Sequence, residues 1–283
     1  MEDRNERQVL FLGAEGQEKI KKAHVAIVGL GGMGSHVAQG LAFLGVEKFV
    51  LIDDDKVSLT NLNRLIGATP EDAQKGELKT AVAEKMIHNI NPNCKMCAIP
   101  KNLRSKEAID ALISSDIIFG CVDRDGSRLI LMELAASYKK TYIDLATEIK
   151  PEEKQIKEFG GRVVISRPGD FCLDCSNQLD KEIAKQELES KSVQELRVAH
   201  GYGLGEEMPA PAVVSLNGVI ANLAITEFLF MITGIREPFR HITYYGLRGK
   251  VNVRDDNRRA DCYICGYLVG TEEKSNIHRY ITV

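Results

Sequence analysis

Two CxxC pairs are the residues whose types and spacing most directly suggest chemistry. Cys172 and Cys175 form the first pair, and Cys262 and Cys265 form the second pair near the end of the chain. Two such pairs supply the four thiolates of a closed tetrahedral Zn²⁺ site, although they could also be unrelated thiols. Because a closed site leaves no position for water, we expect the predicted zinc to stabilise the fold rather than to act in catalysis. It would tie the C-terminal tail to the segment that carries the first pair.

A glycine-rich stretch directly after an apolar run predicts a site for a nucleotide phosphate. The run at 25–28 is short and β-branched, as in a buried parallel strand. Glycines there permit a tight turn and let backbone N–H groups approach a phosphate: Gly29, Gly31, Gly32 and Gly34. Ser35 then opens a helical pattern, whose N-terminus favours an anion.

Acids and bases at the ends of later apolar runs extend this nucleotide site. Asp53 ends the second predicted strand, where an acid accepts hydrogen bonds from a ribose, and Asp54 and Asp55 complete an acidic cluster that could instead be a solvated turn. Arg64 and Lys79 follow, and each alone would be a surface charge. Together with the glycine loop they could neutralise a triphosphate.

One further acid is a candidate ligand for Mg²⁺. Asp123 directly follows the buried apolar run at 117–122. A carboxylate there could hold Mg²⁺ through its oxygens. The alternative is that Asp123 caps the helix predicted from residue 127.

The other cysteines and the histidines give weaker signals. Three cysteines lie in or beside strand patterns and are predicted to be small core residues: Cys94, Cys97 and Cys121. His24 and His36 flank the glycine loop and are interpreted as structural. His200 lies in a charged segment and is a weak candidate for handling a substrate.

The elements that position these residues alternate between strand and helix patterns. Strands are predicted at 25–28, 49–53, 95–99, 117–122 and 141–145, and helices at 35–45, 79–90, 103–112 and 127–138, with a loop containing short helical turns at 56–77. This alternation predicts a parallel sheet covered on both faces. We expect antiparallel strands at 161–167, 242–245 and 250–253, a helical arm at 4–22, an apolar helix at 212–233 and a charged, solvated segment at 178–200.

Composition limits the classes of partner. The 283 residues can bury a core as one large domain or two small ones, and a net charge of −3 gives no argument for a nucleic-acid or membrane partner. No apolar run is expected to reach the ~20 residues of a membrane span. The polar N-terminus lacks a signal-peptide core, so we expect a cytoplasmic protein.

The combination of these motifs resembles the MoeB/ThiF/HesA family, the bacterial relatives of ubiquitin-activating enzymes, over nearly the whole chain. The residues that carry the resemblance are Arg7-Gln8, the loop 29–35, the acids 53–55, Asn61 to Arg64, the stretch 76–79, Cys121 to Asp123, and both CxxC pairs. The resemblance implies one adenylation domain over 1–283, with an arm at 1–23, a nucleotide-binding half at 24–150 and a zinc-bearing substrate half at 151–283. The implied fold is a Rossmann-like, mostly parallel α/β sheet extended by a few antiparallel strands.

Membership would imply a reaction and a set of roles. Such proteins bind ATP and Mg²⁺ and adenylate the C-terminal carboxylate of a small ubiquitin-like or sulfur-carrier protein, releasing pyrophosphate. By position Asp53, beside Asp55, would hold the ribose; Asn61, Arg64 and Lys79 would contact the phosphates; and Asp123 would hold Mg²⁺. Members are usually homodimers in which an arm arginine, here Arg7, reaches into the partner's ATP site.

The chain also departs from this family. Leu65 stands where a glutamine is frequent, and there is no cysteine between Ser176 and Asp261, where many members carry the one that takes the acyl group. We therefore expect adenylation without a thioester at the usual position. Three alternatives remain: adenylation of a small-molecule or peptide carboxylate, a nicotinamide-dependent oxidoreductase, and a non-catalytic partner subunit.

Overall fold

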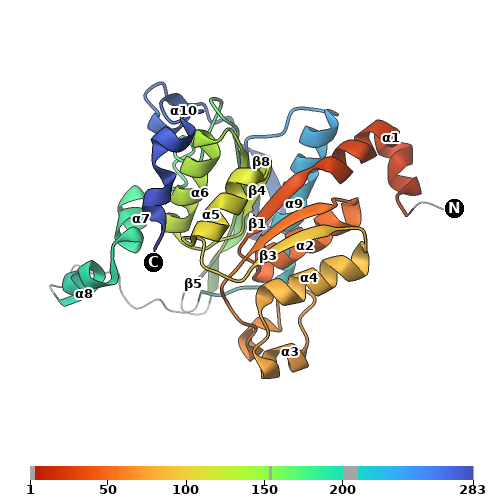
Figure 1. Cartoon of the computed structure of the whole chain (residues 1–283), viewed down its shortest axis with the longest axis horizontal. Helices are drawn as coiled ribbons and strands as arrows, with labels where there is room; N and C mark the ends of the chain where they lie inside the picture. Colours follow the sequence, from red (N-terminus) through yellow and green to blue (C-terminus); the bar gives the residue numbers. More distant parts are fainter. Residues whose placement is uncertain (1–3, 153–154, 200–209, 283) are drawn as a thin grey trace.

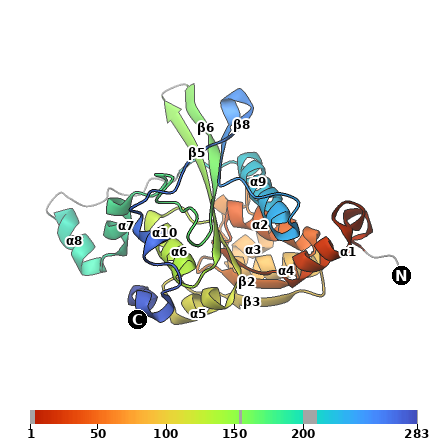
Figure 2. The same ribbon diagram turned by 90° about the horizontal axis from the view of Figure 1, so that it is seen from above.

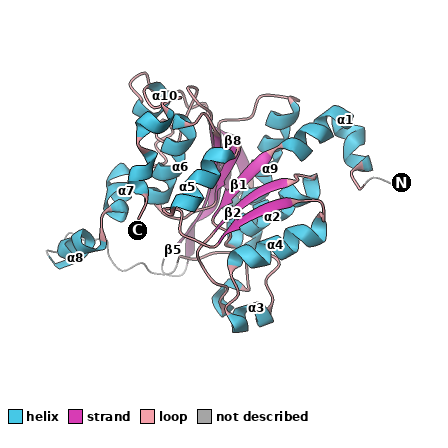
Figure 3. Cartoon of the chain, viewed as in Figure 1, coloured by secondary structure: helices cyan, strands magenta, loops and turns pink. Residues whose placement is uncertain are grey.

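The computed structural model describes residues 4–152, 155–199 and 210–282. Over these residues, eight strands form one sheet in the order β3-β2-β1-β4-β5-β6-β7-β8 (Figures 1 and 3). The strands are β1 (His24–Val28), β2 (Lys48–Ile52), β3 (Lys95–Ile99), β4 (Ile117–Gly120), β5 (Thr141–Glu152), β6 (Gln155–Ser166), β7 (His241–Tyr245) and β8 (Lys250–Val253). The pairs from β3 to β5 are parallel and the pairs from β5 to β8 are antiparallel, which confirms the predicted mostly parallel sheet.

Helices cover both faces of the sheet, as the alternating pattern predicts (Figure 2). They are α1 (Glu6–Lys22), α2 (Gly32–Leu44), α3 (Pro70–Lys75), α4 (Lys79–Ile90), α5 (Lys106–Ser114), α6 (Asp125–Ser137), α7 (Lys181–Leu188), α8 (Lys191–Ala199), α9 (Val214–Thr233) and α10 (Tyr263–Gly266). Strand β1 shows why two layers are needed. Val25 and Ile27 pack with α2, α4 and α9, whereas Ala26 and Val28 pack with α5 and α6.

The β5–β6 hairpin is much longer than the sequence patterns predict. The strand expected at 141–145 continues to Glu152, and its partner begins at Gln155 rather than near residue 161. In Figure 2 this hairpin projects beyond the helical layers. Its outer part carries exposed charges, such as Lys150 paired with Glu148 and Glu158, which obscure a strand pattern. The expected division at residue 150 therefore falls inside a strand of one continuous sheet.

Helix α9 corrects the expectation that no apolar segment approaches membrane length. It has 20 residues and is the one described helix that is long and apolar enough to cross a membrane. Its side chains instead join the core with those of α2 and the sheet. Near its C-terminal end the buried Glu227 pairs with Arg236 at 2.6 Å, as in a core helix of a globular domain.

The charged segment predicted at 178–200 folds into the short helices α7 and α8 up to residue 199. Helix α7 packs on α6, where the Glu187 carboxylate accepts a 2.5 Å hydrogen bond from the Gly126 N–H. Asp180 caps α7 through its own side chain. The segment is therefore helical where it is described, and most of its side chains are exposed, as expected for a solvated segment. His200 lies outside the described residues.

Candidate functional site

The glycine loop after β1 requires glycine at two positions. Gly29 has a φ of +84°, and an added Cβ would lie 2.5 Å from the Cys121 carbonyl oxygen. A Cβ on Gly34 would lie 1.8 Å from the Gly29 carbonyl oxygen. A Cβ on Gly31, in contrast, would meet no atom within 4 Å, so this part of the loop borders open space. The loop thus folds tightly on one side and leaves room for a ligand on the other.

Three strand ends meet at this loop. The Gly29 N–H donates to the Ile52 carbonyl at 2.9 Å, and the Cys121 N–H donates to the Val28 carbonyl at 2.8 Å. The carboxyl ends of β2, β1 and β4 are therefore adjacent, at the point where the chain order of the strands reverses. Ligands of open α/β sheets bind at such a point.

Helix α2 begins at this point with free backbone donors. Its N-cap is Gly31, which offers no side-chain cap. The first N–H groups of the helix are thus available to an anion. Ser35 does not face this space: it is 2% exposed, and its hydroxyl accepts a 3.0 Å hydrogen bond from the Ile66 N–H. Its hydroxyl therefore holds the following loop against α2.

Asp53 is fixed by backbone donors at the end of β2. Its carboxylate accepts hydrogen bonds from the Leu30 N–H at 2.6 Å and from the Asp55 N–H at 2.9 Å. The side chain is 7% exposed, and burial raises the pKa of Asp53 against the lowering effect of Lys79 and these backbone donors. A buried acid held in this way is oriented to accept hydroxyl donors from a ligand.

Lys79 connects the first turn of α4 to the acidic cluster. Its ammonium group lies 2.6 Å from Asp55 and 3.9 Å from Asp53, and its side chain is 11% exposed. Asp54 instead accepts a hydrogen bond from Asn102 at 3.0 Å. The structure therefore brings Lys79 and two of the predicted acids together.

The loop between β2 and α4 carries Asn61 and Arg64. The Asn61 side chain accepts a 3.0 Å hydrogen bond from the Ser58 N–H in a capping box. Arg64 donates to the Thr60 carbonyl at 2.6 Å, and its aliphatic stem packs against Gly32, where an added Cβ would lie 3.1 Å from Cγ. Arg64 thus reaches the start of α2.

Asp123 is exposed in the loop between β4 and α6. The alternative that it caps α6 is wrong, because the helix begins at Asp125 and its N-cap is Arg124. Arg128 fixes this loop, because it donates to the Val122 carbonyl at 3.0 Å and to the Asp125 carboxylate at 2.8 Å. The carboxylate of Asp123 is left at the same edge of the sheet as Asp53.

A buried ionic network behind this loop is not evident from sequence. Asp144 on β5 is 0% exposed and lies 3.4 Å from Arg128 and 3.2 Å from Arg162. The Tyr142 hydroxyl donates to the same carboxylate at 2.8 Å. These residues come from α6, β5 and β6, so the network becomes visible only in the folded structure. The one signal in the sequence is an acidic residue inside an apolar strand pattern.

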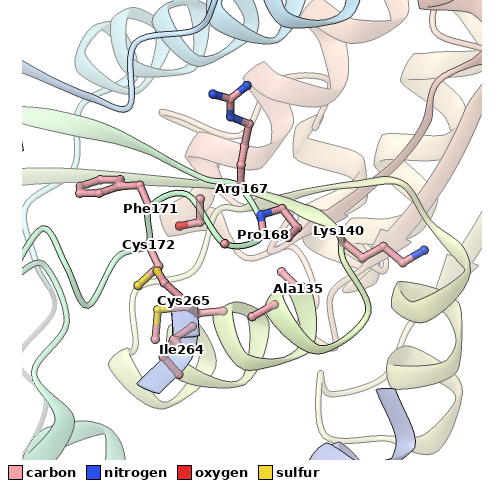
Figure 4. Close-up of a pocket in the computed structure, with 12 residues that line it drawn as sticks. Ala135, Lys140, Arg167, Pro168, Phe171, Cys172, Ile264 and Cys265 are labelled. Carbon is pink, nitrogen blue, oxygen red and sulfur yellow. The ribbon is translucent and has the colours of Figure 1, made fainter. Parts of the chain in front are cut away.

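The four cysteines of the CxxC pairs are buried together. Their ligand atoms all lie within 4.8 Å of one another, with Sγ–Sγ distances of 3.6 Å for Cys172–Cys262, 3.7 Å for Cys172–Cys175 and 3.8 Å for Cys175–Cys265. A tetrahedral Zn²⁺ with bonds of about 2.3 Å requires sulfurs about 3.8 Å apart. The geometry therefore fits the predicted zinc site. Figure 4 shows Cys172 and Cys265 among the residues that line a neighbouring cavity, whose volume is only about 10 Å³.

Cys121 lies at the glycine loop, whereas the other remaining predicted residues lie apart from these clusters. Cys97 is exposed on the edge strand β3, so its predicted core position is wrong, whereas Cys94 and Cys121 are partly buried. Desolvation raises the pKa of Cys94 to about 11, which makes it a poor nucleophile. Arg7 is exposed on α1 and forms no ion pair or hydrogen bond with the described part of its own chain.

Comparison with known proteins adds to this geometry. The model of the ThiF family matches residues 5–267. The sulfur carrier protein ThiS adenylyltransferase of Escherichia coli K12 is 35% identical over 268 residues, covering 93% of this chain and 94% of that protein. The sulfur carrier protein adenylyltransferase of Thermus thermophilus is 34% identical over 143 residues, which span 50% of this chain and about half (52%) of that protein. The crystal structure of E. coli MccB with ATP has a TM-score of 0.72 at 22% identity, covering 93% of this chain and 75% of that one, and shows the shared fold.

Proposed function

The chain belongs to the ThiF family, and we propose that it is an adenylyltransferase that acts on the C-terminal carboxylate of a small ubiquitin-like or sulfur-carrier protein. The observation that carries the proposal is the grouping of the open N-terminus of α2, the buried Asp53 and the Lys79 ammonium group at one sheet edge. This grouping suits a ligand that has both hydroxyl donors and several phosphates. The name of the E. coli relative supports a sulfur-carrier substrate.

In the proposed reaction, ATP lies with its ribose at Asp53 and its phosphates at the start of α2. A carboxylate oxygen of the substrate forms a bond to the α-phosphorus, and the bond from that phosphorus to the pyrophosphate leaving group breaks. No general base is required, since the carboxylate is ionised at neutral pH. Lys79, Arg64 and Asn61 stabilise the negative charge that develops on the phosphates.

Asp123 and the neighbouring acids have the oxygen ligands that Mg²⁺ prefers. When bound, Mg²⁺ would offset charge on the triphosphate. The role of the chain is to keep Asp123 at the sheet edge, and the Arg128 contacts to Val122 and Asp125 fix the loop that carries it. Four thiolates at the zinc site leave no open position, so the proposed zinc acts in folding rather than in the reaction.

We also propose that the active form is a homodimer in which Arg7 completes the partner's site. The exposed guanidinium of Arg7 lacks a partner among the described residues of its own chain, which supports this assignment. Mixing an Arg7→Ala chain with a Lys79→Ala chain should then restore exchange activity in mixed dimers. If the mixture is as inactive as the two variants alone, Arg7 acts in some other way.

The acyl adenylate is proposed to pass directly to an external nucleophile. No cysteine lies between Ser176 and Asp261, where a thioester would otherwise form. Sulfide, an amine or a thiol on another protein would then accept the acyl group. Trapping a thiol-sensitive covalent adduct between substrate and this chain would contradict this part of the proposal.

ATP–pyrophosphate exchange tests the reaction class and the substrate class together. Small proteins ending in Gly-Gly and free carboxylates are compared in the presence of Mg²⁺. Exchange only with a Gly-Gly protein is the expected result. Exchange with a small carboxylate or a peptide would favour the alternative substrate class. ATP binding that NAD displaces, with no exchange, would favour a nicotinamide enzyme instead.

A further inference from the structure

Asn217 is a buried polar side chain at the glycine loop that no role in the reaction yet uses. It lies in the first turn of α9 and is 4% exposed. An added Cβ on Gly32 would lie 2.4 Å from its Nδ2 atom. Its carboxamide forms no hydrogen bond within the described parts of the chain. The side chain is thus placed against the start of α2 without a partner.

Two helix N-termini meet at this position. Helices α2 and α9 pack together (Figures 1 and 2), and a Cβ on Gly218 of α9 would lie 3.2 Å from the His36 ring of α2. Neither helix has a side-chain cap at its N-cap residue, Gly31 for α2 and Val213 for α9. Both ends therefore present backbone donors and a positive dipole end, which favour an anion.

Asn217 is a polar residue on an otherwise apolar face of α9. Neighbouring residues of α9, such as Leu216, Ile220 and Ala221, are apolar and belong to the core. An amide that is largely withdrawn from water favours a hydrogen-bond partner. A bound group that accepts the N–H of Asn217 would explain why a polar residue stands among these apolar neighbours.

The position of Asn217 identifies which part of the nucleotide it meets. The Leu30 N–H contacts Asp53, which marks the ribose end of the loop. Gly32 lies further along, at the start of α2, where the Arg64 stem packs. Building on the proposed nucleotide site, we infer that Asn217 donates its side-chain N–H to the β- and γ-phosphates of ATP and is a further catalytic residue.

Calorimetric titration of ATP and of AMP tests this inference without any carboxylate substrate. Asn217→Asp places a negative charge against the phosphates, and Asn217→Ala removes the donor. We expect ATP affinity to fall by on the order of 100-fold for Asp and about 10-fold for Ala, the effects typical of a lost charge-stabilising donor. AMP affinity should stay within about 3-fold, since AMP lacks the β- and γ-phosphates.

The matched control is Asn222→Asp on the same helix. Asn222 is exposed, and its carboxamide donates to the Gly218 carbonyl at 2.7 Å, so this variant should bind ATP like the wild type. Thermal unfolding checks the fold, and if the Asp variant does not fold, the Ala variant decides. ATP affinity unchanged in Asn217→Ala, or ATP and AMP affinities that fall equally, would overturn the role of Asn217. Absence of ATP binding by the wild type would instead overturn the nucleotide site itself.

Discussion

The Lys79 ammonium group lies 2.6 Å from the Asp55 carboxylate, in a site that also holds Asp53 at 3.9 Å. The side chain of Asp55 is 68% exposed, whereas that of Lys79 is 11% exposed. Asp55 can therefore turn into solvent while Lys79 stays at the sheet edge. The acids thus hold the lysine in place without a ligand, and in the proposed ATP complex a phosphate would replace Asp55 as its anionic partner.

Replacing Lys79 should weaken ATP binding far more than it changes the fold. Lys79→Met keeps the apolar stem but removes the charge that we propose faces the phosphates. We expect ATP affinity to fall by about 100-fold, measured by calorimetry. The control is Lys75→Met on α3, whose ammonium group pairs with Glu71 at the surface. An equal loss of ATP affinity in both variants would indicate a general effect of net charge rather than a direct contact between Lys79 and ATP.

The raised pKa of Asp53 predicts a pH-dependent contribution to stability. Because burial raises the folded-state pKa above the ordinary value of 3.8, the folded state favours the protonated acid. The contribution of Asp53 is therefore full below its unfolded pKa and is lost as the pH rises through its folded pKa. The free energy of unfolding of the wild type, minus that of Asp53→Asn, should therefore fall as the pH rises above the ordinary value of 3.8. The same trend in the exposed control Asp54→Asn would contradict this assignment.

Asp144 should be among the most sensitive positions of the fold. Asp144→Ala removes the carboxylate paired with Arg162 and leaves Arg128 with Asp125 as its remaining ion-pair partner. Removing one partner of a buried ion pair costs about 3–5 kcal/mol. Urea denaturation measures this loss, and Asp110→Ala, which breaks a surface pair with Lys106, should change stability little. A loss no larger than that of the control would show that the network contributes little to stability.

Zinc removal should destabilise the C-terminal region without acting on nucleotide contacts directly. We expect about one Zn²⁺ per chain, held by the two CxxC pairs. A chelator, or Cys265→Ser, should lower the melting temperature and release the tail at α10 to proteolysis, because the site joins segments far apart in sequence. Elemental analysis and limited proteolysis measure both effects, and Cys97→Ser is the control with an exposed thiol. Full metal content in Cys265→Ser would rule out the assigned ligands.

The parallel part of the fold could be predicted because its signals are local. Short β-branched runs, the glycine loop and the helical pattern after it each depend on neighbouring residues. The length of β5 could not be predicted in this way. Its outer half carries exposed charged residues, which are equally common in loops. Cys97 was misplaced for a related reason: a strand pattern does not reveal whether the strand is at an edge of the sheet.

The site was predicted only in part, because some contacts exist only in three dimensions. Asp53 and Lys79 follow recognisable elements, and the CxxC spacing indicates a ligand set. Asn217, in contrast, lies within an apolar helix pattern and reaches Gly32 only because α9 packs on α2. The Asp144 network likewise joins residues from different elements, and no local pattern indicates it.

The central claim, adenylation of a carrier protein's C-terminus, is tested most directly by the intact mass of the carrier. A small protein ending in Gly-Gly is incubated with the chain, ATP and Mg²⁺, in the presence of pyrophosphatase. We predict a carrier that has gained one adenylyl group, which neither a carrier lacking its terminal glycine nor the Lys79→Met chain produces. An unmodified mass for every carrier in the panel, while a small-molecule carboxylate is converted to its adenylate, would contradict the claim.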